Sequence, residues 1–294
     1  MTETKKGNIF ILSEMVLWSL FPIVSLLGLK GLPSIVSLFW VNLFCTIFFF
    51  LIMVFKNRWH ELKNKQLWYY ILGAVIFIHI IFYGLYFFAL GKTVPTNAAI
   101  VALFEIVPSY IIFQIIKKER LDRKHIFGIV LAIIGALIVL LPGVKGIHTG
   151  DLIILGAVFF APFGNWCQQQ ARKISSTETT LFLRHLLATP FLFILIYFMG
   201  FSIEIGKIEN VIGWLLLNSI LIFGVSKILW VEAIHRMSVT KALAINSLNP
   251  VFTMLFSWLL LMQLPTPVQF ISLPFLVLSI IILTDFKFSK MKFR

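Results

Sequence analysis

Ten stretches of this chain are each about 20 residues long and almost wholly apolar. The hydrocarbon core of a bilayer is about 30 Å thick, so a helix needs around 20 apolar residues to cross it. The stretches are residues 8–28, 34–55, 67–90, 96–116, 125–142, 152–171, 180–199, 211–234, 240–262 and 267–285. We therefore predict an all-α polytopic membrane protein with ten transmembrane helices, numbered below as spans 1 to 10.

The composition agrees with a lipid environment and excludes several other classes of protein. Hydrophobic residues make up 60% of the chain and charged residues 13%, against about 25% charged residues in an average soluble domain. The net charge of +13 would suggest nucleic acid in a soluble protein. Here the basic residues cluster between apolar runs, so we predict no nucleic-acid partner. Cys45 and Cys167 lie inside apolar runs, and we predict no metal site and no cofactor.

Lysine and arginine are unevenly divided between the two sides of the predicted membrane. With the N-terminus in the cytoplasm, 18 of the 25 lie on the cytoplasmic side, including Lys118 and Lys287, and 4 lie on the other side. Positively charged residues are retained in the cytoplasm during membrane insertion. We therefore expect both termini to be cytoplasmic.

The two halves of the chain resemble each other at an offset of 144 residues. The segment "ALGKTVPTNAAIV" at 89–101 aligns with "AIHRMSVTKALAI" at 233–245. Gly128 and Gly135 in span 5 align with Ser272 and Ser279 in span 10, and these small-residue faces would pack within one chain or between two chains. Because five is odd, the second half must enter the membrane from the opposite side. Such inverted repeats are typical of secondary transporters, whose site lies between the halves near the midplane.

The segment "AIHRMSVTKALAINSLNPVFTMLFSWLLLMQLPTP" at 233–267 is similar to the EamA-type members of the drug/metabolite transporter superfamily. It has an Ala-rich start and Pro250 near the middle of span 9, whereas Gln263 replaces the acidic residue that closes this helix in the family. The resemblance covers nearly the whole chain and implies two EamA-like repeats, 1–145 and 146–294. It also implies transport of small metabolites across a bacterial inner membrane, often outward, without fixing the substrate.

Ionisable residues within the spans are the candidates for a substrate site. Such a side chain costs at least roughly 2.5–3.5 kcal/mol at the bilayer centre, so it usually faces the bundle interior or water. Glu105 lies near the middle of span 4, followed by Pro108, which frees a backbone carbonyl one turn back. Glu14 in span 1 and Lys227 in span 8 lie at similar depth, so an ion pair is feasible if these spans meet.

Aromatic and amide side chains share helix faces with these charges. We predict eleven substrate-binding residues, namely Glu14, Trp18, His79, Tyr83, Glu105, Asn165, Trp166, Lys227, Trp230, Asn246 and Asn249. Packing of His79 and interhelical hydrogen bonds of the asparagines are the structural alternatives. Arg184 and His185 lie near the cytoplasmic end of span 7, where we expect snorkelling or contact with lipid headgroups.

The leading hypothesis is a secondary transporter, an exporter, of an amino acid or related zwitterion. Lys227 and the asparagines of span 9 would receive the carboxylate, and Glu14 or Glu105 would hold the ammonium and exchange a proton. The alternative substrate is a quaternary ammonium compound or cationic drug, which suits aromatic faces and carboxylates. A membrane enzyme or scaffold is the alternative from another class. The expected partners are a small molecule and membrane lipid, with protons as coupling ion, for a monomer or homodimer.

Overall fold

Every regular element of the described chain is helical. The computed structural model describes residues 3–117, 123–140, 148–203 and 205–283. The predicted repeat boundary at residues 145 and 146 lies outside these ranges, as do Lys118 and Lys287. Span 1 consists of α1 (Glu3–Trp18) and α2 (Phe21–Gly28), and span 2 is α3 (Ser34–Lys56). Span 3 consists of α4 (Lys65–Ala74), the π-helix η2 (Val75–Tyr83) and α5 (Gly84–Leu90). Span 4 consists of α6 (Pro95–Ala102), η3 (Leu103–Glu105) and α7 (Ile106–Lys117), and span 5 is α8 (Arg123–Leu140).

The second half repeats this pattern of continuous and interrupted helices. Span 6 consists of α9 (Thr149–Ala157) and α10 (Ala161–Ile174), and span 7 is α11 (Thr177–Phe198). Span 8 consists of α12 (Ile212–Leu217), the π-helix η5 (Asn218–Ser226) and α13 (Lys227–Arg236). Span 9 consists of α14 (Val239–Ile245), η6 (Asn246–Leu248) and α15 (Asn249–Leu261), and span 10 is α16 (Pro267–Leu283). The short helices η1 (Trp59–Lys63) and η4 (Ile205–Lys207) lie in connections.

Helix length and surface composition both fit a lipid environment. Within the described ranges, 7 helices are long and apolar enough to cross a membrane. Three shorter apolar helices, Ile126–Gly135, Asn249–Leu261 and Pro267–Ser279, fall in predicted spans 5, 9 and 10. Large apolar side chains point outward, such as Phe55 at 86% and Phe198 at 79% exposure. In water this surface would be unfavourable, so the chain is an integral membrane protein.

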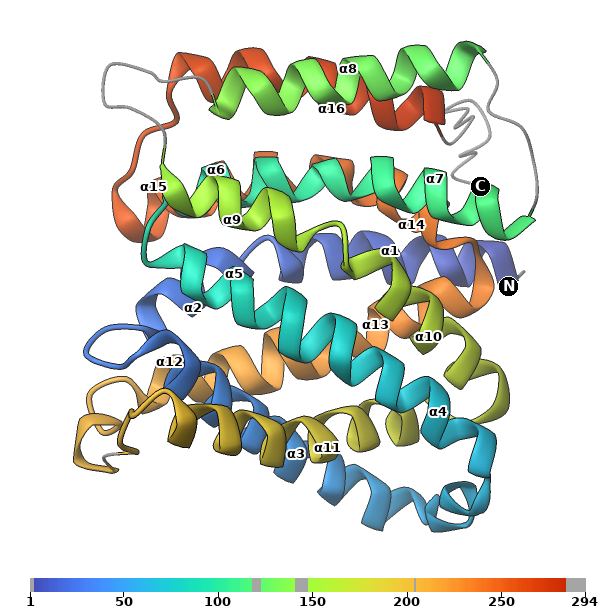
Figure 1. Ribbon diagram of the computed structural model, residues 1–294, viewed down its shortest axis with the longest axis vertical. Coiled ribbons are helices and arrows are strands. Elements are labelled where there is room, and N and C mark those ends of the chain that lie inside the picture. Colours follow the sequence, from blue (N-terminus) through green and yellow to red (C-terminus); the bar gives the residue numbers. More distant parts are fainter. Residues whose placement is uncertain (1–2, 118–122, 141–147, 204, 284–294) are drawn as a thin grey trace.

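The two halves cross the molecule in opposite directions. In Figure 1, α1 begins and α16 ends at the right-hand edge, whereas α8 ends and α9 begins at the left-hand edge. The first half therefore starts on one side and the second half on the other. This is the predicted inverted arrangement, and the right-hand edge is called the terminal side below.

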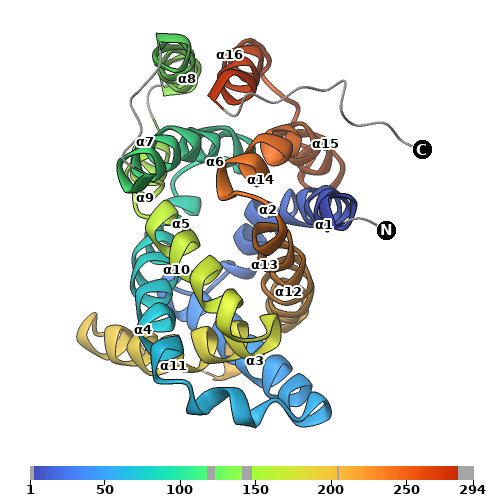
Figure 2. The same cartoon turned by 90° about the vertical axis from the view of Figure 1, so that its right-hand side faces the viewer.

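Contacts between the halves occur in symmetric pairs. Helix α1 packs on α13, which joins spans 1 and 8, and α10 packs on α4, which joins the equivalent spans 6 and 3. Spans 2 and 7 pack on each other through α3 and α11, and spans 5 and 10 do so through α8 and α16. Figure 2 shows α8 and α16 side by side at one end of the molecule. The small-residue faces of spans 5 and 10 thus meet within one chain, where Gly135 approaches Leu276.

The crossing of α3 and α11 shows where the pseudo-twofold axis passes. Asn42 Nδ2 donates to the backbone carbonyl of His185 at 2.9 Å, and the Thr46 and Thr189 hydroxyls are 3.2 Å apart. Both pairs are separated by 143 residues. The π-helices and the η3 and η6 turns are related by the same shift. In these elements the two halves are therefore related by 143 residues, one fewer than the offset of 144 in the segment at 89–101. Glu105 accordingly corresponds to Leu248, and not to Asn249 as an offset of 144 would give.

Four spans are broken where proline prevents a continuous helix. Pro22 and Pro162 are the second residues of α2 and α10, positions where the missing N–H costs little. The Ser19 carbonyl at the first break accepts a hydrogen bond from Thr253 Oγ1 at 2.9 Å. Lipid could not supply this bond, so α15 satisfies the broken backbone of span 1.

Close approach of α10 to η2 requires a glycine. A Cβ at Gly164 would overlap Ile78 Cγ1 and would lie 3.2 Å from the Ile78 backbone nitrogen. At Gly156, in the same span, a Cβ would meet no atom within 4 Å.

Gly164→Ala should therefore lower the free energy of unfolding by about 1–3 kcal/mol, because the added methyl overpacks this contact. Gly156→Ala is the matched control and should be neutral or stabilising by about 0.5–1 kcal/mol. Thermal unfolding of the detergent-solubilised protein measures both. Equal midpoints for the two variants would contradict the close contact.

Candidate functional site

A cavity lies between the two halves at the level of the helix breaks. Trp18, Pro22, Glu105, Ala161 and Asn246, which flank the four breaks, all line it. About 90 Å³ is open to the centres of water-sized molecules, which is room for several waters. Nine of the eleven predicted residues line the cavity: Glu14, Trp18, Tyr83, Glu105, Asn165, Lys227, Trp230, Asn246 and Asn249.

Glu14 and Lys227 form an ion pair in the cavity wall. Lys227 Nζ donates to Glu14 Oε1 at 2.9 Å, and Ser226 Oγ donates to the same oxygen at 3.3 Å. The side chain of Lys227 is 6% exposed and that of Glu14 is 0% exposed. Lys227 Nζ also lies 3.2 Å from the centroid of the Trp18 ring, a cation–π contact. Spans 1 and 8 do meet, and the charge of Lys227 is balanced within the protein.

Glu105 ends a chain of amide hydrogen bonds across the cavity. Asn165 Nδ2 donates to Glu105 Oε1 at 2.9 Å, while Asn165 Oδ1 accepts from Gln168 Nε2 and from Trp230 Nε1, both at 3.2 Å. Gln168 Oε1 in turn accepts from Arg184 Nη1. The chain therefore runs from a guanidinium on α11 through two amides on α10 to a carboxylate on η3.

The position of Arg184 differs from the one expected from the sequence. We expected it to snorkel to the headgroups, but its side chain is fully buried and lines the cavity. Helix α11 begins at Thr177, earlier than the predicted start at residue 180. Arg184 thus lies about 10 Å along the helix at 1.5 Å per residue. Gln168 and Tyr86, also absent from the prediction, could have been found three residues beyond Asn165 and Tyr83 on the same helix faces.

His79 and Trp166 are the two predicted residues that do not line the cavity. His79 is fully buried and lies in the π-helix η2, where its ring contacts those of Tyr83 and His185. Trp166 packs edge-on against Tyr70 of α4, with ring centroids 5.9 Å apart. It follows Asn165 by one residue, and a helix turns by about 100° per residue, so the two side chains diverge.

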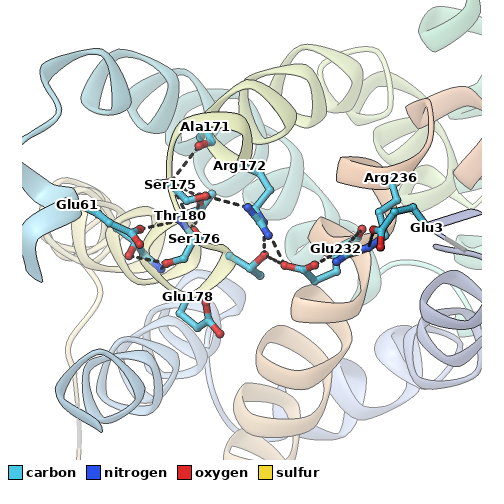
Figure 3. A network of polar contacts seen from close by, with 12 residues as sticks. Glu3, Glu61, Ala171, Arg172, Ser175, Ser176, Glu178, Thr180, Glu232 and Arg236 are labelled. Atoms are coloured by element: carbon cyan, nitrogen blue, oxygen red, sulfur yellow. Dashed lines mark hydrogen bonds and ion pairs between the residues drawn. The ribbon is translucent and has the colours of Figure 1, made fainter. Parts of the chain in front are cut away.

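On the terminal side, charges and hydroxyls of α1, α10, α11 and α13 form a polar network (Figure 3). Glu232 of α13 contacts Arg236, Arg172 of α10 at 3.1 Å and Thr177 of α11. Arg236 Nε also binds Glu3 of α1 at 2.9 Å. The network therefore ties together the ends of spans 1, 6, 7 and 8 on this side.

The same network continues to the connection between spans 2 and 3. The Ser176 backbone N–H donates to Glu61 Oε2 at 2.6 Å, as Figure 3 shows. Partial burial raises the pKa of Glu61, but the hydrogen bonds from Ser176 and Thr179 lower it by more, so the pKa lies below its ordinary value. The charged Glu61 therefore holds η1 against the start of α11 at neutral pH.

A second polar cluster lies at the opposite side. Asp151, at the start of α9, is 1% exposed and accepts hydrogen bonds from Thr93 and from Asn97 Nδ2, the latter at 3.0 Å. Gln269 Nε2 of α16 donates to Asn97 Oδ1 at 2.6 Å. Spans 4, 6 and 10 are thus joined on this side, and polar contacts between the halves occur at both ends of the molecule.

Comparison with known proteins identifies the family. The profile of the EamA-like transporter family matches the chain twice, at residues 5–141 and 148–285. The chain belongs to the EamA-like transporter family. This is a family of membrane transporters, a class whose members move small molecules between aqueous compartments and contact membrane lipid, and the cavity described above lies between its two matched repeats.

Individual relatives agree with this assignment. An uncharacterized transporter of Archaeoglobus fulgidus is 29% identical over 201 residues, which cover 66% of this chain and 62% of that protein, so the match spans less than two thirds of the relative. An uncharacterized transporter of Synechocystis sp. is 22% identical and the transporter YyaM of Bacillus subtilis is 26% identical, covering 81% and 67% of this chain. A crystal structure with 15% identity and a TM-score of 0.70 covers 96% of this chain and shares its fold.

Removing one partner of the Glu14–Lys227 pair should destabilise this EamA-like transporter, because a buried charge would lose its counter-charge. Loss of one partner from a buried ion pair typically costs about 3–5 kcal/mol. We expect Glu14→Gln and Lys227→Met each to lower the thermal midpoint strongly, and the double variant to recover most of the loss. Additive losses in the double variant would show that the two groups are not coupled.

Proposed function

We propose that this EamA-like transporter is a secondary exporter of a small amphipathic zwitterion, such as an amino acid. The observation that supports this most directly is Glu105, a carboxylate in the cavity wall that forms no ion pair with any described residue. Glu14, the other carboxylate of the cavity, is already paired with Lys227. Glu105 is therefore the group that would hold the ammonium of a substrate, and Asn165 fixes its orientation.

The cavity walls suit an amphipathic molecule. Phe82, Tyr83, Tyr86 and Trp230 provide aromatic surface in the same cavity as Glu105, and Asn246 and Asn249 provide amides from span 9. Trp18 is covered by the Lys227 ammonium on one side and stacks on Phe21 at 4.1 Å, so it supports the ion pair. An apolar body with a cationic group at one end would match this lining.

Transport would follow alternating access between the two inverted repeats, which we assign to residues 1–145 and 146–294. The polar network on the terminal side would be the closed gate of that side, and the Asp151 cluster would close the other. The helix breaks of spans 1, 4, 6 and 9 would absorb the movement. Glu105 would take up a proton when the substrate leaves, which couples export to proton entry. The lysine and arginine distribution supports placing the terminal side in the cytoplasm of a bacterial inner membrane.

A cation without a carboxylate is the second candidate substrate. The neutralisation of Lys227 by Glu14 favours it, because that ammonium no longer repels a positively charged compound. Aromatic rings around an unpaired carboxylate are the usual surroundings of a bound quaternary ammonium. Choline and amino acids should therefore be compared directly in any transport assay.

Glu105→Gln should abolish proton-driven transport in proteoliposomes while leaving the protein folded, because the amide can neither carry a proton nor balance an ammonium. Glu209→Gln, the same change at an exposed site outside the cavity, is the control and should transport at the original rate. The compound used in this assay is the amino acid that gives the largest thermal shift with the original protein. Full activity of Glu105→Gln would exclude Glu105 from the mechanism.

Glu232→Gln should open the terminal side more often, because it weakens contacts with two arginines. The measure is labelling of Leu243→Cys, a cavity position, in a background without Cys45 and Cys167. An impermeant maleimide is added to vesicles whose terminal side faces outward. We expect labelling about tenfold faster in Glu232→Gln. Glu178→Gln, which removes the ion pair with Lys56 on the same side and leaves the contacts of Glu232 in place, should leave the rate unchanged; equal rates in both variants would contradict the gate.

A further inference from the structure

A buried arginine in the cavity has no carboxylate partner among the described residues. Arg184 is fully buried, and its guanidinium forms hydrogen bonds with Gln168 Oε1 and, at 3.3 Å, with His185 Nε2. Its Nε has no hydrogen-bond partner within the described ranges. A guanidinium carries five N–H donors. Arg184 therefore retains both an unbalanced charge and free donors in the wall of the cavity.

The neighbours of Arg184 are fixed and neutral. Asn42 Nδ2 donates to Thr189 Oγ1 at 2.7 Å and to the His185 carbonyl, so Asn42 Oδ1 is the acceptor that faces His185 Nδ1 at 2.7 Å. His185 must then carry its proton on Nδ1, which leaves Nε2 free to accept from Arg184. Gln168 is oriented by its bond to Asn165. The arginine is thus held in place by an imidazole and an amide, neither of which balances its charge.

A charge in this position requires an anion that the described chain does not provide. Charged side chains inside a bilayer are expensive and normally occur in pairs. Lys227 obeys this rule through Glu14, whereas Arg184 and Glu105 do not. These two groups lie at opposite ends of the chain of amides formed by Gln168 and Asn165. The cavity therefore presents one positive and one separate negative group, which are complementary to the carboxylate and the ammonium of a zwitterion.

We propose that Arg184 binds the carboxylate of the transported molecule, while Glu105 binds its ammonium. The proposal rests on the proposed function and assigns the carboxylate to Arg184 in place of Lys227. A carboxylate can accept two parallel N–H bonds from a guanidinium, an arrangement that lysine cannot provide. Substrates with a free carboxylate are thus selected over cations that lack one.

The test compares free amino acids with their methyl esters, which keep the ammonium and lose the negative charge. The probes are L-alanine, L-leucine, L-phenylalanine, their methyl esters and choline, and binding to the purified full chain is measured by thermal shift and by isothermal titration. The original protein should bind the best free acid at least tenfold more tightly than its ester. This comparison needs no variant and so does not depend on the folding of one.

Variants of Arg184 then assign the preference to this side chain. Arg184→Gln should weaken binding of the free acid tenfold or more and leave the ester unchanged, and Arg184→Lys should keep part of the preference because it retains the charge. Glu105→Gln, in contrast, should weaken acid and ester alike. A purely structural role of Arg184 would change both ligands equally, which distinguishes it from carboxylate binding.

The outcomes separate this inference from the proposed function. If the original protein binds ester or choline as tightly as the free acid, or if Arg184→Gln weakens both ligands equally, the carboxylate site is wrong while transport through the cavity stands. If none of the probes binds the original protein, the proposed zwitterion function fails, and the inference fails with it.

Discussion

Hydrocarbon cannot solvate a charge or accept a hydrogen bond, and this constraint determines where the polar residues of the chain lie. Glu14, Glu105, Arg184 and Lys227 all fall within apolar stretches, yet all four line one cavity between the halves. Around them, the outward surface is apolar, with side chains such as Phe55 largely exposed. The cavity exists because these groups can be satisfied only by each other, by amides and by molecules that enter from water.

The inverted repeat supplies the partners that each half lacks. The broken backbone of span 1 is capped by Thr253 of the second half, and the ion pair of the cavity joins Glu14 of the first half to Lys227 of the second. The amide chain likewise runs from the second half to Glu105 in the first. Neither half could satisfy these groups alone. The polar contacts that form the cavity are therefore also the contacts that hold the two halves together.

The sequence predicted the architecture and six of the eight charged and amide residues of the cavity wall, because both follow from hydropathy. An ionisable residue in the middle of a span must face inward, which is sufficient to place Glu14, Glu105 and Lys227. Arg184 was missed because the polar residues at the start of α11 resemble a loop, so the predicted span began too late and put the arginine near the interface. His79 lies in a π-helix, which does not follow the spacing of an α-helix, and its side chain does not line the cavity.

The buried charges of the cavity differ in what a substrate could do to them. A carboxylate that took Lys227 would have to displace Glu14, which would leave that side chain charged, buried and unpaired, at a typical cost of about 3–5 kcal/mol. It would also disturb the contact of Lys227 with Trp18. A carboxylate at Arg184 displaces only neutral partners and adds the counter-charge that is missing. Lys227 is thus suited to holding α1 against α13 throughout transport, and Arg184 is suited to a partner that arrives and leaves.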